Sequence, residues 1–173
     1  MGTLRLPHDT GTQLLETAWS RGIRVFDVGG TYSGGLAEEH LGRFLQELQK
    51  KAPHARSEMI LIGQVGLISQ GLQSEWKRHS GNDVFKEKSI SHSGATLCLH
   101  PEWVKQSLEH SLNTLGVDCI DVALISQPEL FLLDARDRNA RFRDILDTEI
   151  SNLLVDAFTE LEHQCDLGKV QFY

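Results

Sequence analysis

The stretch that decides the fold of this chain is Arg24-Val-Phe-Asp27-Val-Gly-Gly-Thr-Tyr32-Ser-Gly-Gly-Leu-Ala-Glu-Glu-His-Leu-Gly42. It reads as a short apolar strand that ends in a carboxylate, followed by a glycine-rich loop and the start of a helix. In a parallel α/β barrel, side chains at the carboxyl ends of the strands project into the active site. The stretch therefore predicts Asp27 at a strand end, and Tyr32 in the loop after it, as candidate site residues.

Helical and strand-like patterns alternate on both sides of this stretch. Apolar runs predict strands over residues 23–27, 59–63, 119–125 and 169–173. Helical spacing of apolar residues predicts helices between them, with Thr12 as the cap of the first helix, Gly22 as its end and Pro101 in the first turn of a later one. This alternation predicts βα units, and so an α/β fold with a parallel sheet and outer helices.

The regular pattern stops between residues 66 and 99, where Ser, Gly, Lys and His are frequent. We expect this region to be a long insertion loop within a single domain of residues 1–173, placed over the candidate site because it follows a strand end. A solvated insertion without a role in the site is the alternative. A further polar link is expected over residues 134–143.

Composition excludes several classes of function. The chain has 173 residues, 17 basic and 24 acidic side chains and a net charge of −7, which disfavours nucleic-acid binding. No apolar run reaches the roughly 20 residues that span a bilayer, so we expect a soluble protein. Three cysteines without CxxC spacing favour a reducing compartment and no metal site. A cytoplasmic location is preferred, a mitochondrial one stays open, and the eight histidines are expected at the surface or as caps.

Four segments in order resemble the aldo-keto reductase family. They are Gly22-Ile-Arg-Val-Phe-Asp27 with Tyr32 and Glu39-His-Leu-Gly42, then Ser107 to Val122, then Leu124-Ile-Ser-Gln-Pro-Glu129, and lastly Ala157 to Glu162 with Gly168-Lys-Val170. Each motif is weak alone, but their order and spacing make the resemblance strong. It implies the N-terminal half of a TIM (β/α)8 barrel, because a complete barrel takes roughly 250 residues.

The family resemblance also implies hydride transfer from NADP(H) to a carbonyl, with a tyrosine as proton donor. A phenol is a weak acid at neutral pH, so an ammonium oriented by a carboxylate must assist it, while an imidazole orients the carbonyl. Asp27 and Tyr32 match the carboxylate and the acid, and Asp27 is also the expected cofactor contact. Gln64 stands where the family has lysine, and Ser126 where it has histidine.

Because an amide supplies no charge and a hydroxyl has a shorter reach than an imidazole, we expect impaired reductase chemistry and a role as a structural subunit or scaffold. Lys77, Lys86 or Lys88 would restore a cation only if the insertion folded back. The alternatives are an active NAD(P)H-dependent carbonyl reductase of which this chain is an incomplete part, and a nucleotide-binding redox sensor without turnover. The expected partner is another protein chain or the missing half of the barrel. The substrate does not follow from the sequence.

Overall fold

The computed structural model describes residues 8–79, 81, 83–92, 94–137 and 150–173 of the chain. The elements of its first half are α1 (His8–Ser20), β1 (Val25–Gly29), η1 (Tyr32–Gly35), α2 (Leu36–Lys51), η2 (Ala55–Glu58) and β2 (Ile60–Val65). Next come η3 (Gln70–Leu72), α3 (Gln73–His79), α4 (Asp83–Glu87), β3 (Ser89–His92) and β4 (Ala95–Cys98). The last are α5 (Pro101–Leu115), β5 (Ile120–Ile125), α6 (Leu130–Asp137), α8 (Ser151–Asp166) and β6 (Val170–Phe172).

The main sheet has four strands in the order β1-β2-β5-β6, and every neighbouring pair is parallel. Each strand is reached through at least one helix, as parallel pairing requires. The predicted α/β class, with a parallel sheet and outer helices, is therefore confirmed. Since all four strands run the same way, their carboxyl ends lie at one edge of the sheet.

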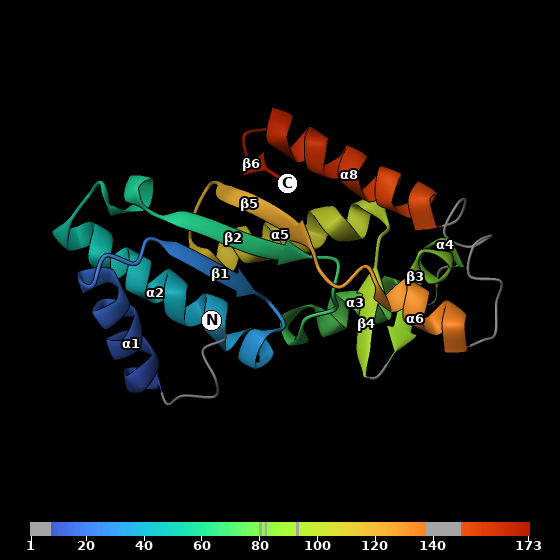
Figure 1. The fold of residues 1–173 in the computed structure, drawn as a ribbon, viewed down its shortest axis with the longest axis horizontal. Coiled ribbons are helices and arrows are strands. Elements are labelled where there is room, and N and C mark those ends of the chain that lie inside the picture. Colours follow the sequence, from blue (N-terminus) through green and yellow to red (C-terminus); the bar gives the residue numbers. More distant parts are fainter. Residues whose placement is uncertain (1–7, 80, 82, 93, 138–149) are drawn as a thin grey trace.

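Helices cover one face of this sheet. Helices α1, α2, α5 and α8 pack in that order, with α2 against β1 and α5 against β2. In Figure 1 this layer runs from α1 and α2 below the strands, past α5 behind them, to α8 above. The core between sheet and helices is apolar and includes Phe26, Leu41, Leu45, Leu61, Val65, Val104, Leu108, Leu115, Ile120 and Leu161. The four-stranded sheet is thus covered by helices on one face, as each part of a parallel α/β barrel is.

The opposite face of the sheet is open in this chain. Strand residues alternate between the two faces, and three apolar residues of the uncovered face are exposed: Val25 at 51%, Ile60 at 45% and Leu124 at 42%. Ile62 and Val122 on the same face are half-buried. Phe172 on the edge strand β6 is 66% exposed. An apolar groove of about 380 Å³ also lies between α1 and β1, at the other edge of the sheet.

Several predicted boundaries are wrong by a few residues. Strand β1 begins at Val25, two residues later than expected, so Asp27 lies in the middle of the strand and Gly29 at its end. Strand β2 continues to Val65 and therefore includes Gln64. Pairing of Gly29 with Gln64 extends both strands beyond their apolar runs. Thr12 lies inside α1, because the helix already includes His8, whereas Gly22 does adopt the predicted left-handed backbone, with φ of 84°.

The region expected to be a long loop contains regular structure. Residues 66–99 include α3, α4 and the antiparallel hairpin of β3 and β4, which lie beyond the arrowheads of β1 and β2 in Figure 1. A second apolar cluster of Leu72, Phe85, Cys98 and Trp103 stabilises them, and the indole of Trp103 donates to the Gly66 carbonyl at 3.1 Å. Short elements with few apolar residues lack a clear periodicity, which is why the sequence did not predict them. The predicted polar link at 134–143 begins inside α6, and its remainder lies outside the described residues.

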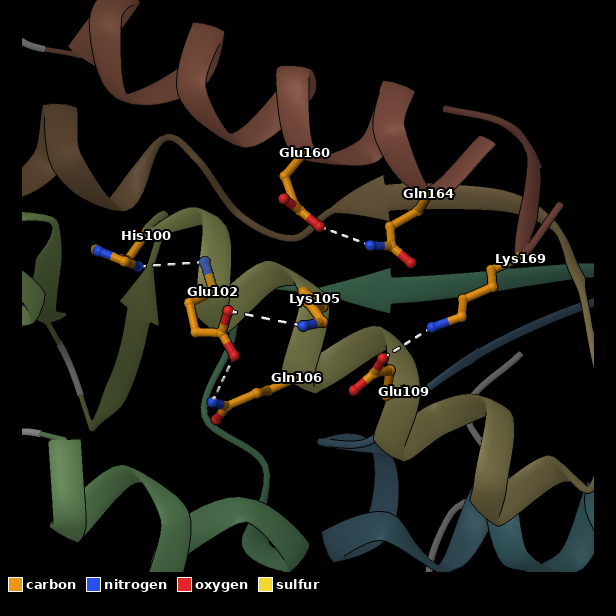
Figure 2. Close-up of polar contacts among 8 residues, drawn as sticks. All are labelled: His100, Glu102, Lys105, Gln106, Glu109, Glu160, Gln164 and Lys169. Atoms are coloured by element: carbon orange, nitrogen blue, oxygen red, sulfur yellow. Dashed lines mark hydrogen bonds and ion pairs between the residues drawn. The ribbon is translucent and has the colours of Figure 1, made fainter. Parts of the chain in front are cut away.

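Histidines were expected at the surface or as helix caps. This prediction is confirmed for His100 at the start of α5 and is wrong for His40 in α2. Figure 2 shows His100 at the start of α5, where its Nδ1 accepts from the backbone N–H of Glu102 at 3.2 Å. Figure 2 also shows the Lys169 ammonium donating to Glu109 at 2.8 Å, which links the start of β6 to α5. His40, by contrast, is buried in α2 against Gly11 of α1, because Gly11 leaves room for an imidazole between the two helices.

A half-buried ion pair anchors the amino ends of the central strands. The carboxylate of Asp121 lies 2.9 Å from the Arg56 guanidinium and accepts the backbone N–H of Leu61 at 2.7 Å. Arg56 also donates to the backbone carbonyls of Met59 and Cys119. The pair therefore joins the segment before β2 to the start of β5.

We predict that Asp121→Asn lowers the free energy of unfolding by about 1–3 kcal/mol, because the carboxylate's charge-assisted bonds are lost in a partly buried setting. Urea denaturation monitored by circular dichroism measures this. Glu47→Gln, which removes the exposed pair with Lys50, is the matched control and should leave stability unchanged. Equal stability of both variants would contradict the anchoring role.

Candidate functional site

The parallel register brings Asp27 and Gln64 to one face of the sheet. Asp27 pairs with Ile62, and Gln64 lies two residues further along β2. Residues two apart in a strand point to the same side, so the two side chains are diagonal neighbours near the carboxyl edge. The Gln64 Nε2 donates to Asp27 Oδ1 at 3.0 Å.

The Gln64 amide makes two further contacts. Its Nε2 also donates to the Tyr32 hydroxyl oxygen, and its Oε1 accepts the Ser126 hydroxyl at 2.9 Å. The four residues singled out in the sequence therefore lie together, and we call Asp27, Tyr32, Gln64 and Ser126 the Gln64 cluster. Since a carboxylate can only accept, Asp27 determines which end of the Gln64 amide faces β1.

Backbone geometry places Tyr32 and Ser126 in the cluster. Tyr32 begins the short helix η1, where Ser33, Gly34 and Gly35 all have positive φ, at 52°, 70° and 97°. Two of these are glycines, which adopt that conformation without strain, so the loop turns sharply and returns Tyr32 over the sheet edge. Ser126 follows β5 directly, is buried, and donates its backbone N–H to the carbonyl of Val65.

Gly29 is a site-shaping residue that the sequence analysis missed. A Cβ at this position would lie 3.0 Å from Gln64 Oε1 and 3.1 Å from Gln64 Cβ, so any larger residue would displace the amide. In the sequence, Gly29 and Gly30 indicate only a glycine-rich loop. Their position just after the candidate carboxylate Asp27 is the signal that could have indicated the close approach of another side chain to the backbone.

Glu38 is a second residue that the sequence did not single out. It lies in the first turn of α2 with its side chain fully buried, and its Oε1 accepts the Ser111 hydroxyl of α5 at 2.7 Å. Burial raises the pKa of Glu38, and the Ser111 bond opposes this only in part. A carboxyl group in this setting favours its neutral form.

Cations in the described part of the chain lie elsewhere. Lys88 pairs with Asp156 of α8, Lys86 pairs with Asp83, and Lys77 is exposed on α3. No Lys or Arg of the described ranges is within ion-pair distance of Asp27, and no group of three His, Cys, Asp or Glu side chains there could hold a metal ion. The cluster is thus a neutral hydrogen-bond network around one carboxylate. No helix within the described ranges is long and apolar enough to cross a bilayer.

We predict that Gln64→Glu destabilises the protein at neutral pH and less so at pH 5. Two carboxylates at this distance bind a shared proton more tightly than they do in the unfolded chain. A raised folded-state proton affinity stabilises the fold at low pH and loses its effect as the pH rises, so the free energy of unfolding should fall by roughly 1–3 kcal/mol between pH 5 and 7. Urea titrations at both pH values, with wild type as the reference, measure the difference. A pH-independent loss would mean that the two side chains are not adjacent.

Comparison with known proteins places this geometry in a family. The sequence matches the Aldo/keto reductase family over residues 1–172. It is 26% identical over 181 residues to the D-threo-aldose 1-dehydrogenase of a Pseudomonas species, covering 95% of this chain and 50% of that protein. The chain therefore spans about half the length of the curated relative that it matches.

Solved structures give the same fold. The chain resembles the holo form of the aldo-keto reductase AKR11C1 from Bacillus halodurans, with a TM-score of 0.64, 16% identity and coverage of 99% of this chain but 42% of that one. The four parallel strands and their outer helices thus correspond to a part of a TIM barrel, as expected. From the family match over nearly its whole length, together with this fold, we conclude that the chain belongs to the aldo/keto reductase family.

Proposed function

We propose that this aldo/keto reductase family chain is impaired in reductase chemistry and acts as a structural subunit or scaffold. The observation that carries the proposal is the bonding of Gln64, whose amide nitrogen donates to both Asp27 and Tyr32. An amide can orient a phenol, but it brings no positive charge to stabilise a phenolate as the proton leaves. General acid catalysis by Tyr32 would therefore lack its usual electrostatic support.

The Ser126 hydroxyl supports the same conclusion. Its hydrogen is donated to Gln64 Oε1, so it is not directed at a carbonyl substrate. Gln64 likewise uses both amide hydrogens inside the cluster. The hydrogen-bond donors that would orient a substrate oxygen are thus used to hold the cluster together.

One feature favours the second candidate, an active reductase that is completed by further chain. The Tyr32 oxygen accepts from Gln64, and within the described ranges no acceptor takes the hydroxyl's own hydrogen. That hydrogen can be donated to a carbonyl at the sheet edge. Activity would then depend on how far an unassisted phenol can serve as the acid.

The cavity beside the cluster, as the described residues form it, has neither the size nor the charge of a nucleotide site. The cavity beside the cluster is lined by Gly30, Thr31, Gln64, Leu67, Ser69, Leu72, Ser107, His110, Ser111 and Ser126. It has no Lys or Arg to meet a diphosphate and is far smaller than a nucleotide. NADP(H) is expected from the family alone, Asp27 stays the proposed contact, and we derive no step through the cofactor.

A structural role agrees with the open surfaces of the sheet. Val25, Ile60 and Leu124 are exposed on its uncovered face, and the groove between α1 and β1 is apolar. Exposed apolar surface and unpaired strand edges favour association. We propose that a further barrel half, or another protein chain, covers them.

We predict that NADPH consumption with simple aldehydes stays near background for the unmodified chain and rises in Gln64→Lys/Ser126→His. The double substitution returns a cation and an imidazole to the cluster, and acid–base assistance is typically worth about 10²–10⁴-fold. The longest available form of the protein should be used, with absorbance at the nicotinamide band as the readout. Gln64→Lys/Ser126→His combined with Tyr32→Phe is the control, because any gain that depends on the phenol should then disappear.

Robust turnover by the unmodified protein, abolished by Tyr32→Phe, would overturn the proposal in favour of an active reductase. NADPH binding by fluorescence without turnover in any variant would instead favour a nucleotide sensor.

We also predict that the 173-residue chain associates in solution. Light scattering should give a mass at least twice the 19.4 kDa of one chain, or a dye for apolar surfaces should bind strongly. Val25→Lys, on the exposed edge strand β1, should weaken both signals, while Glu47→Lys on the exposed side of α2 should not. A monomer that binds no dye would refute the prediction.

A further inference from the structure

A small cavity adjoins the Gln64 cluster, with Gln64 and Ser126 in its wall. It is lined by ten residues, among them Gly30, Ser69 and Ser111 together with the cluster members Gln64 and Ser126. About 10 Å³ is accessible there to the centre of a water molecule, which is close to the minimum that holds one water. The cavity is thus the size of a single water molecule, and its wall combines polar side chains with Leu67 and Leu72.

Two buried side chains have an unpartnered oxygen near this cavity: Ser69, which lines it, and Glu38, which is bonded to the lining residue Ser111. Glu38 is 0% and Ser69 4% exposed. Neither the Oε2 of Glu38 nor the Oγ of Ser69 has a hydrogen-bond partner within the described part of the chain. A buried polar atom without a partner costs roughly 1–3 kcal/mol, so native proteins usually satisfy such atoms with protein groups or ordered water.

Gly30 relates the two atoms in space. A Cβ on Gly30 would lie 3.2 Å from Ser69 Oγ and 3.4 Å from Glu38 Oε2. The same Cβ would lie 3.0 Å from Ser69 Cβ, so both oxygens lie close to Gly30 and only a residue without a Cβ fits between them. Gly30 and Ser69 also line the cavity, so a water in the cavity can approach both oxygens past Gly30.

We propose that Gly30, Glu38 and Ser69 form a binding site for one internal water molecule, which links the first turn of α2 to the loop after β2 behind the Gln64 cluster. The bound water would supply partners to both buried oxygens, which accounts for a glycine, a carboxyl group and a serine around one small volume. Internal waters of this kind typically make about three hydrogen bonds. Ser111, which is also at the cavity, remains bonded to the other carboxyl oxygen of Glu38.

Glu38 presents its second carboxyl oxygen, Oε2, to the proposed water, because its Oε1 already accepts from Ser111. Burial raises the pKa of Glu38, and the Ser111 hydrogen bond opposes this in part. The titratable groups around it are His110, which lines the cavity from α5, and Asp27, which is reached through Gln64. The inference does not depend on whether the chain turns over a substrate, because it concerns only how the cluster is supported.

The test uses nuclear Overhauser transfer from water to the backbone amides of residues 30 and 69, together with thermal unfolding. In the unmodified chain both amides should show transfer from a long-lived water. Gly30→Ala, whose methyl would lie between the two oxygens, and Ser69→Ala, which removes a partner, should lose this transfer. Each should also lower Tm by about 5 °C, the shift expected when one buried partner is lost in a chain of this size.

Matched controls separate these effects from general changes in composition. Gly81→Ala adds a methyl where nothing lies within 4 Å, and Ser74→Ala removes an exposed hydroxyl; both should keep the transfer and the Tm. Glu38→Gln keeps a hydrogen-bonding group of the same size at the same place and should keep the transfer. The side-chain amide resonances of Gln64 should shift in Gly30→Ala and Ser69→Ala but not in either control.

Three results would overturn the proposal. The first is no water transfer to residues 30 and 69 in the unmodified chain. The second is retention of that transfer in both Gly30→Ala and Ser69→Ala. The third is a rise of Tm with sodium chloride that choline chloride at equal ionic strength does not reproduce, since this would indicate a bound cation. If Gly30→Ala does not fold, retention of the transfer in Ser69→Ala is sufficient to overturn the proposal.

Discussion

The parallel pairing of β2 with both β1 and β5 is the constraint on which the site depends. It sets Gln64 opposite Gly29 on one side and Leu124 on the other. From this central strand the Gln64 amide reaches Asp27, Tyr32 and Ser126, which come from three separate segments. The Gln64 amide is neutral and has two N–H donors and one acceptor oxygen, which suffices for one hydrogen bond to each partner. Gln64 therefore connects the carboxyl ends of the strands without adding charge.

At the carboxyl edge of the sheet, the backbone must also pass close to neighbouring side chains. Gly29 leaves room for the Gln64 side chain, and Gly30 leaves room beside Ser69 and Glu38. Further out, Gly42 of α2 lies so near α5 that a Cβ would be 2.5 Å from the carbonyl of Thr114. The helices therefore approach the sheet and one another where glycines occur, and the small polar cavity is a consequence of that packing.

Local sequence pattern predicted the elements that have strong periodicity. The Pro101 start of α5 and the left-handed Gly22 after α1 follow from backbone preference alone. The pattern failed between residues 66 and 99, because β3, β4 and α4 are too short to show a period. It also ended β1 and β2 too early, since strand ends are decided by pairing with a neighbour and not by apolarity.

The sequence by itself determined the α/β class, the order of helices and strands, and the absence of lysine and histidine at positions 64 and 126, because these are properties of residue type and local spacing. Tertiary structure alone decided that Gln64 bonds to both Asp27 and Tyr32, that His40 is buried, and that Glu38 faces Ser111. Such contacts join residues up to 73 positions apart. They depend on strand register and helix packing, which arise only when the whole chain has closed around its core.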